Sequence, residues 1–185
     1  MGMDVPRDEE GVYYDLDDYV GAWRRVLIDI SDVIVAVVLC CLVLLPVLFL
    51  LPEDEHVWTQ AFFFVCSAVW FVYFVILKRS RFRTLGYVIG GARIVNLQGN
   101  RPSVVSLIIR LLFALIGPFN FVVDLLWVGC DSYRQALRDK FAHTYVIRND
   151  AQPAGHGRIE YANYTILGFN FLFREVRPAT EANEP

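Results

Sequence analysis

Apolar residues gather in three blocks along the chain, at residues 26–51, 57–77 and 104–130. The first block contains 19 consecutive residues without a charge, from Val33 to Leu51, and the second holds only isolated polar side chains. A helix of about 20 apolar residues, at about 1.5 Å rise per residue, crosses a bilayer. The first two blocks are therefore predicted to be transmembrane helices.

The third block differs, because it contains Arg110 and Asp124 and is broken by a Gly-Pro pair at 117–118. Each half has about 13 residues, which reach only about 20 Å as a helix. A bent, re-entrant or interfacial pair of short helices would keep both flanks on one side of the membrane, and a simple third span is the alternative. Residues 91–100 and 143–148 alternate as strands do, and they can pair only if the block returns to the side it left. This favours the bent form.

Charged residues around the first two blocks predict their orientation. The loop at 52–56 is acidic and has no Lys or Arg, whereas four cations lie between Lys78 and Arg83. Positive residues flank membrane helices on the cytoplasmic side. We therefore expect a multi-pass protein of the cell membrane, in which the acidic N-terminal segment 1–21 is cytoplasmic.

The C-terminal tail, residues 149–185, begins with a linker that contains Pro and Gly. Residues 161–176 within it are rich in aromatic side chains, some of which alternate. This pattern fits either a strand or a segment that lies on the membrane surface. Together with the three blocks, it predicts an all-α integral membrane protein with a small two-stranded cytoplasmic β element.

Composition agrees with a membrane protein and argues against other classes. Hydrophobic residues make up 56% and charged residues 20% of the 185 residues, whereas soluble domains have about 45–50% and about 25%. A net charge of −3 gives no general attraction to nucleic acid. The four cysteines lie in apolar runs without a CxxC pair and the three histidines are scattered, so neither a metal nor a cofactor is expected. The chain has no nucleophile–base pair or Gly-rich phosphate loop, and we do not expect an enzyme.

Charged residues inside the blocks are the candidates for function, because a charge at the centre of a membrane helix costs at least about 2.5–3.5 kcal/mol. Arg25, Asp29 and Asp32 have the spacing i, i+4, i+7 and share one helical face. Asp32 would be stabilised by Arg25, by Arg110 or by water. Arg110 and Asp124 could bridge the two halves of the third block and hold its bend. These residues form either a ligand or ion site or a structural charge network.

A polar cluster follows the third block, at residues 131–140. On a helix, its acidic and basic side chains would be neighbours. Spacing alone therefore predicts a solvated helix end with salt bridges.

An ordered series of motifs runs along residues 22–147. Arg25 is followed seven residues later by Asp32, and a Thr-Leu-Gly turn at 84–86 precedes the first predicted strand. Arg110 comes next, and the series ends with Asp139 and a second strand. In this order and spacing, the chain resembles the RDD family of small, mostly bacterial integral membrane proteins.

The resemblance implies a bacterial inner-membrane protein whose membrane domain covers residues 22–148, and it makes Asp139 a functional or architectural residue. The family is generally described as of unknown function, with ligand or ion transport suggested. The chain has Tyr87, Arg138 and His143 where the family has Lys, His and a small residue. A role that needs a loop cation or an imidazole beside Asp139 is therefore not carried over.

Two functions follow as expectations. The first is transport of ions or small ligands through a charged site of Arg25, Asp32 and Asp139 near the cytoplasmic face. Because two or three spans cannot enclose a path, the protein would then act as a homo-oligomer. The alternative is a membrane-embedded scaffold or interaction subunit without transport activity, which docks other membrane protein subunits through its acidic N-terminus and aromatic tail. Both place the chain in a lipid bilayer without nucleic acid.

Overall fold

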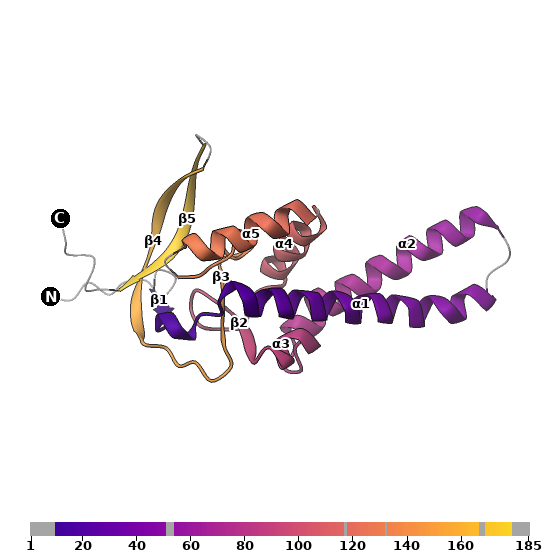
Figure 1. The fold of residues 1–185 in the computed structure, drawn as a ribbon, viewed down its shortest axis with the longest axis horizontal. Helices are drawn as coiled ribbons and strands as arrows, with labels where there is room; N and C mark the ends of the chain where they lie inside the picture. Colours follow the sequence, from indigo (N-terminus) through magenta and orange to yellow (C-terminus); the bar gives the residue numbers. More distant parts are fainter. Residues whose placement is uncertain (1–9, 51–53, 117, 132, 167–168, 179–185) are drawn as a thin grey trace. The chain divides into compact units, whose positions relative to one another are not determined.

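The computed structural model describes residues 10–50, 54–116, 118–131, 133–166 and 169–178 (Figure 1). The chain divides into two compact units. Trp23–Gly90 form the first, which we call the helical unit, and Met1–Ala22 with Gly91–Pro185 form the second, which we call the mixed unit.

Two long apolar helices dominate the helical unit. Helix α1 spans Ala22–Leu50, and helix α2 spans Glu55–Phe71 and continues as a π-helical segment, η3, at Val72–Leu77. Among the described residues, two stretches are long and apolar enough to cross a membrane, Ala22–Val47 and Glu55–Leu77. They lie where the first two apolar blocks predict spans.

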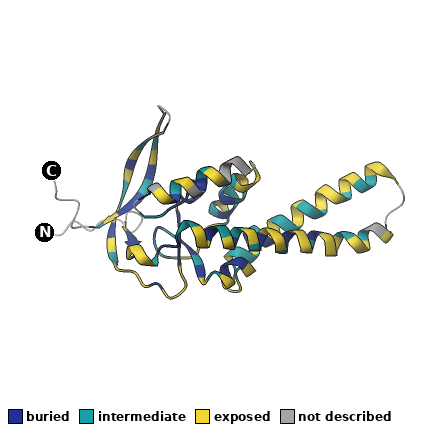
Figure 2. Cartoon of the chain, viewed as in Figure 1, coloured by how far each residue is buried: buried dark blue, intermediate teal, exposed yellow. Residues whose placement is uncertain are grey.

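The buried face of α1 recurs every three or four residues along the helix. Its buried residues are Arg25, Ile28, Asp32, Ala36 and Cys40. Much of the rest of α1 and of α2 is apolar and exposed, as Figure 2 shows. Only 17% and 11% of the residues in the most apolar windows of the two stretches are buried. Since a core helix of a soluble protein is mostly buried, these helices suit apolar surroundings instead.

The mixed unit contains two antiparallel sheets. In the smaller one, β2 (Ala92–Asn96) pairs with β3 (Thr144–Arg148), so that the first residue of β2 lies opposite the last residue of β3. This is the two-stranded element that the sequence predicts. The larger sheet has the order β1–β4–β5. Its strands are Glu10–Tyr13, Gly155–Ile166 and Phe169–Pro178.

The prediction of an all-α protein needs correction here. A residue of the N-terminal segment, Glu10, lies opposite Arg158, and β4 and β5 pair along their length from Gly157 to Ile166. Of the two alternatives for residues 161–176, the structure has strands at 161–166 and 169–176, and residues 167–168 lie outside the described residues. Between β1 and α1 lies a short 3-10 turn, η2, at Leu16–Asp18.

The third apolar block forms two separate helices, α4 (Val104–Leu115) and α5 (Pro118–Cys130), with 12 and 13 residues. The break falls at the predicted Gly-Pro pair, whose residue 117 lies outside the described residues. The hydroxyl of Ser103 accepts the Ser106 N–H at 3.0 Å and begins α4. A third helix, α6 (Leu137–Ala142), leads into β3.

The core of the mixed unit joins segments from both ends of the chain. The rings of Tyr19 and Tyr145 meet edge to face, with centroids 5.5 Å apart, and Val176 of β5 is fully buried in the same cluster. Gly11 in β1 allows this packing, because a Cβ there would lie 2.3 Å from a Val176 methyl group. The core therefore requires β1, β3 and β5 together.

Candidate functional site

Asp32 is the centre of a polar cluster in the helical unit, and its side chain is fully buried. Its Oδ1 accepts hydrogen bonds from the Tyr73 hydroxyl at 3.0 Å and from the Gly86 N–H at 2.7 Å. Its Oδ2 accepts one from the Thr84 hydroxyl at 2.7 Å, and the Lys78 Nζ lies 3.7 Å away. Both oxygens of the carboxylate are therefore engaged by residues 73–86.

The Thr-Leu-Gly turn brings two of these donors to Asp32. Thr84 has extended backbone and precedes helix α3 (Leu85–Ile89), whose first N–H groups have no partner within the helix. A Cβ on Gly86 would lie 2.3 Å from the Ile28 carbonyl oxygen and 2.6 Å from Asp32 Oδ1. Only glycine permits this approach, so the turn is the point at which α3 packs on α1.

The other candidate residues of the helical unit, Arg25 and Asp29, differ in how far they are buried. On the face predicted for α1, Arg25 and Asp32 are buried and Asp29 is partly exposed. Lys78 extends over two aromatic rings, with its Nζ 5.2 Å from the Phe74 centroid and 4.6 Å from that of Tyr87. The hydrogen bonds to Asp32 come from a tyrosine, a threonine and a backbone amide, which the sequence analysis did not anticipate.

Arg110 and Asp139 form a buried ion pair in the mixed unit. The Nη1 of Arg110 donates to Asp139 Oδ1 and also to the Thr144 hydroxyl, at 3.0 Å from the latter. The other oxygen of Asp139 accepts the Ala136 N–H at 3.2 Å and so closes the first turn of α6. The pair therefore holds α4, α6 and β3 together.

Asp124 of α5 pairs with Arg138, the residue before Asp139. Its Oδ1 accepts the Arg138 N–H at 3.0 Å, and its Oδ2 lies 3.1 Å from the Arg138 Nε. Burial raises the pKa of the Asp124 carboxyl, and the Arg138 guanidinium opposes that rise. The two residues of the predicted Arg110–Asp124 bridge each form an ion pair with a residue of α6, Arg110 with Asp139 and Asp124 with Arg138.

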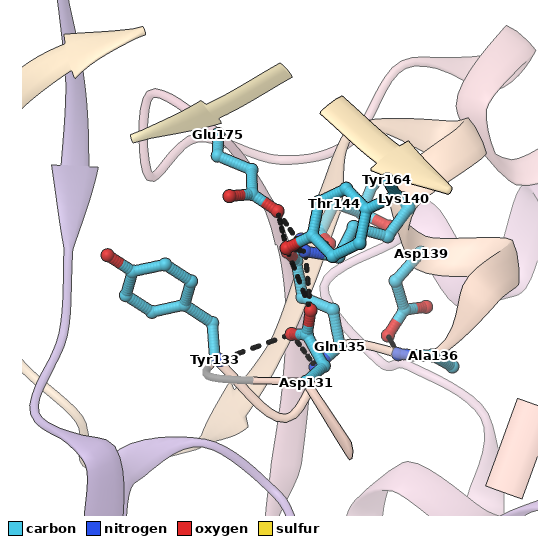
Figure 3. Close-up of polar contacts among 9 residues, drawn as sticks. All are labelled: Asp131, Tyr133, Gln135, Ala136, Asp139, Lys140, Thr144, Tyr164 and Glu175. Atoms are coloured by element: carbon cyan, nitrogen blue, oxygen red, sulfur yellow. Dashed lines mark hydrogen bonds and ion pairs between the residues drawn. The ribbon is translucent and has the colours of Figure 1, made fainter. Parts of the chain in front are cut away.

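A third cluster surrounds Lys140, which has no exposed side-chain surface (Figure 3). Its Nζ lies 2.6 Å from Asp131, forms an ion pair with Glu175 of β5 and donates to the Tyr164 hydroxyl at 3.1 Å. The Tyr164 hydroxyl lies 2.6 Å from Glu175 and donates to it. Burial, and then the bond to Glu175, raise the pKa of Tyr164, so its hydroxyl keeps its proton.

The loop before α6 completes the Lys140 cluster. The second oxygen of Asp131 accepts the N–H groups of Tyr133 and Gln135 at 3.1 and 2.9 Å. The Gln135 side chain donates to the Thr144 carbonyl at 3.0 Å. The described residues from 131 to 136 form a turn rather than a helix. Ion pairs are present, as predicted, and residues 137–140 are helical as the start of α6 (Leu137–Ala142). The prediction that this end is solvated is wrong, because the described residues from 131 to 140 are largely buried.

The described residues contain no group of three or more His, Cys, Asp or Glu side chains that could hold a metal ion. The RDD family model matches residues 19–143, about two thirds of the chain. The chain belongs to the RDD family. The match includes Asp32, Arg110 and Asp139, and together with the two apolar helices it fits a membrane protein. No curated protein and no solved structure matches the chain.

The residues that resemble the RDD pattern lie in two different units. Arg25 and Asp32 belong to the helical unit, whereas Arg110 and Asp139 belong to the mixed unit. Each of the two aspartates is fully buried and accepts hydrogen bonds from its own unit. A single charged site of Arg25, Asp32 and Asp139 stays a prediction.

Sequence reasoning missed the Lys140 cluster as a buried site. One signal was available, because Phe171, Phe173 and Glu175 alternate and so lie on one face of a strand. A carboxylate on an aromatic face is expected to be buried with a partner. The partner itself had no such signal, since Lys140 stands beside Asp139 in a segment that reads as an exposed helix end.

Proposed function

We propose that this RDD-family protein is a multi-pass inner-membrane protein that acts as a membrane-embedded scaffold or interaction subunit. In this proposal its buried charges are architectural. The observation that carries it is the engagement of Asp32, whose two oxygens accept three hydrogen bonds and lie beside Lys78. A cargo ion or ligand would have to displace donors that also hold α3 on α1.

The distribution of charge supports a cytoplasmic N-terminus. In the proposed topology, α1 and α2 form a hairpin, the acidic loop at 52–56 lies outside, and the cations from Lys78 to Arg83 lie in the cytoplasm. Asp32 contacts Thr84 and Gly86, which follow α2, so it belongs near the end of the span rather than at its centre. The part of α1 that follows, from Val33 onward, carries no charge and would cross the hydrocarbon core of the bilayer.

Ion transport is the second candidate function. It is favoured by the position of Asp32, a fully buried carboxylate in a helix long enough to cross a membrane. Proton and cation pathways use carboxylates at such positions. Because two apolar helices enclose no path, this function requires a homo-oligomer.

Reconstitution of the full chain into proteoliposomes distinguishes the two functions. H⁺, Na⁺ and K⁺ fluxes are measured for the wild type, for Asp32→Asn and for Asp29→Asn, the last being a matched change at a partly exposed position of the same helix. The scaffold proposal expects no flux in any of them, and a larger fall in unfolding temperature for Asp32→Asn, which is fully buried, than for Asp29→Asn. Flux in the wild type that Asp32→Asn abolishes without loss of folding would establish transport instead.

The scaffold role has its own requirement, which is a persistent assembly. Membranes that contain the full chain are solubilised in nanodiscs formed directly from the native bilayer, and the mass of each particle's protein content is measured. We expect complexes that hold more than one chain, either copies of this protein or other subunits. A uniform population of lone monomers would disprove the proposal.

A further inference from the structure

Helices α4 and α5 of the mixed unit carry large apolar side chains that are more than half exposed (Figure 2). We call these side chains the outer apolar set. They are Val105, Leu112 and Leu115 of α4, its C-cap residue Ile116, and Val122 and Leu126 of α5, with exposed fractions from 52% to 72%. Side chains of this size scattered singly on a surface need no explanation, but six of them on two short consecutive helices do.

The charged residues of the same two helices, Arg110 and Asp124, point the other way. On α4, Leu107 and Arg110 are the buried residues, three positions apart on one face. On α5, Asp124 and Val128 are buried at the spacing i, i+4. The charges thus face the interior, where they pair with α6, and apolar side chains face outward. This is the reverse of an amphipathic helix on a soluble domain.

After α4 and α5, the chain returns to the part of the mixed unit from which α4 begins. Arg110 and Asp124 reach two adjacent residues of α6, Asp139 and Arg138, so the two helices converge on one turn. Before α4 and after α6, β2 and β3 pair directly. At 12 and 13 residues, each helix is about 18–20 Å long, whereas a bilayer has about 30 Å of hydrocarbon.

We infer that the α4–α5 pair inserts the outer apolar set into one leaflet of the bilayer and returns to the side from which it enters. The inference rests on the membrane location proposed above. The occupant of this surface is lipid, because α1 and α2 of the same chain keep the mixed unit tethered to a bilayer. One cation agrees with it, since exposed Arg101 precedes α4, where it can meet anionic headgroups.

Depth-dependent fluorescence quenching tests the contact with lipid. The full chain, with its four native cysteines changed to serine and shown to remain folded, receives one cysteine at Leu115 or, as a matched solvent control, at Asp150, which is 71% exposed in the same unit. Each is labelled with the dye NBD in vesicles of phosphatidylcholine and phosphatidylglycerol that contain nitroxide-labelled lipid. We expect a blue-shifted, strongly quenched signal from Leu115→Cys and an unquenched signal from Asp150→Cys. Val122→Cys repeats the measurement on α5.

If the NBD fluorescence at both Leu115→Cys and Val122→Cys is not quenched, the inference is overturned, whether water or another protein covers these side chains. Sidedness is measured separately with a membrane-impermeant maleimide on Arg101→Cys, Arg134→Cys and Arg79→Cys. We expect all three to react from the same side. Reaction of Arg101→Cys and Arg134→Cys from opposite sides would show a third span and overturn the inference.

Alkaline extraction of the same membranes separates this inference from the proposed function. A chain that stays in the membrane while Leu115→Cys is unquenched disproves only the lipid contact of α4 and α5. A chain that alkali releases disproves the proposed multi-pass topology itself.

Discussion

Lys140 shows most clearly how single residues hold this molecule together. An ammonium group loses several kcal/mol of hydration when it is buried, and it regains them only from close, well-oriented partners. Here the partners are Asp131 in a loop, Tyr164 in β4 and Glu175 in β5, all within reach of one Nζ atom. The cluster therefore fixes α6 against the sheet in a single geometry, which nonspecific apolar packing does not achieve.

Replacement of Lys140 by methionine tests this role at the residue scale. Lys140→Met keeps the apolar stem but leaves Asp131 and Glu175 buried without a cation, so we expect a loss of about 3–5 kcal/mol in the free energy of unfolding. The measurement is denaturant unfolding of the detergent-solubilised full chain. Arg148→Met is the control, because the Arg148–Asp150 pair is exposed and should contribute no more than about 1 kcal/mol. Equal losses in the two variants would contradict a structural role for Lys140.

At the scale of elements, the short helix α3 depends on a close approach to α1. Its second residue, Gly86, donates to Asp32, and its C-cap residue, Gly90, also meets α1, since a Cβ there would lie 2.4 Å from an Ile28 side-chain carbon. Asp32 thus acts on α3 as an N-cap residue would, although it lies on another helix. The Thr-Leu-Gly turn at 84–86 and Asp32 therefore act together to hold α3 against α1.

Two glycine-to-alanine substitutions, expected to differ in their effect on stability, test this contact between α3 and α1. Gly86→Ala places a Cβ against Asp32 and the α1 backbone, and we expect it to lower the unfolding temperature and to expose Asp32. Gly129→Ala in α5 meets nothing within 4 Å, so it should be neutral or raise stability by about 0.5–1 kcal/mol. Thermal unfolding of both variants is the measurement. A Gly86→Ala protein as stable as the wild type would show that α3 does not need this contact.

Elements with local sequence signals could be predicted, and those that depend on distant partners could not. The two long helices, the break at 117–118 and the β2–β3 pair all follow from apolar runs, a Gly-Pro pair and short alternations. Strand β1 has only four residues, and its partner in β4 lies at the other end of the chain. No local pattern reveals such a pairing, and the larger sheet was therefore missed.

The candidate site divides in the same way. Asp32, Arg110 and Asp124 could be chosen from the sequence because charges in apolar blocks are conspicuous. Arg25 could be chosen because it shares a helical face with Asp32, and Asp139 through the resemblance to the RDD family. Their partners could not be chosen, because the spacing of residues in the sequence does not indicate a hydrogen bond from a backbone amide or from a tyrosine far along the chain. For the same reason, the ion pairs of Arg110 and Asp124 with α6 emerge only from the folded chain.

At the scale of the whole molecule, the mixed unit needs the C-terminal hairpin. A chain that stops after Ala154 lacks β4 and β5, and with them Glu175, Tyr164 and the core residue Val176. We expect such a truncation to leave α1 and α2 in the membrane but to make the region from residue 91 onward sensitive to protease. The full chain treated identically is the control. A protease-resistant fragment from the truncated chain would show that the hairpin is dispensable.

The placement of β1 beside β4 has a consequence for biosynthesis. Chains emerge from the ribosome from their N-terminus, at about 5–20 residues per second. Residues 10–13 emerge well before residues 155–158, with which they pair. Contacts so far apart in the chain form slowly, because the intervening segment must first be closed into a loop. The mixed unit therefore completes its fold only after residues 155–158 have been synthesised, when the helices between its two parts have already had time to enter the bilayer.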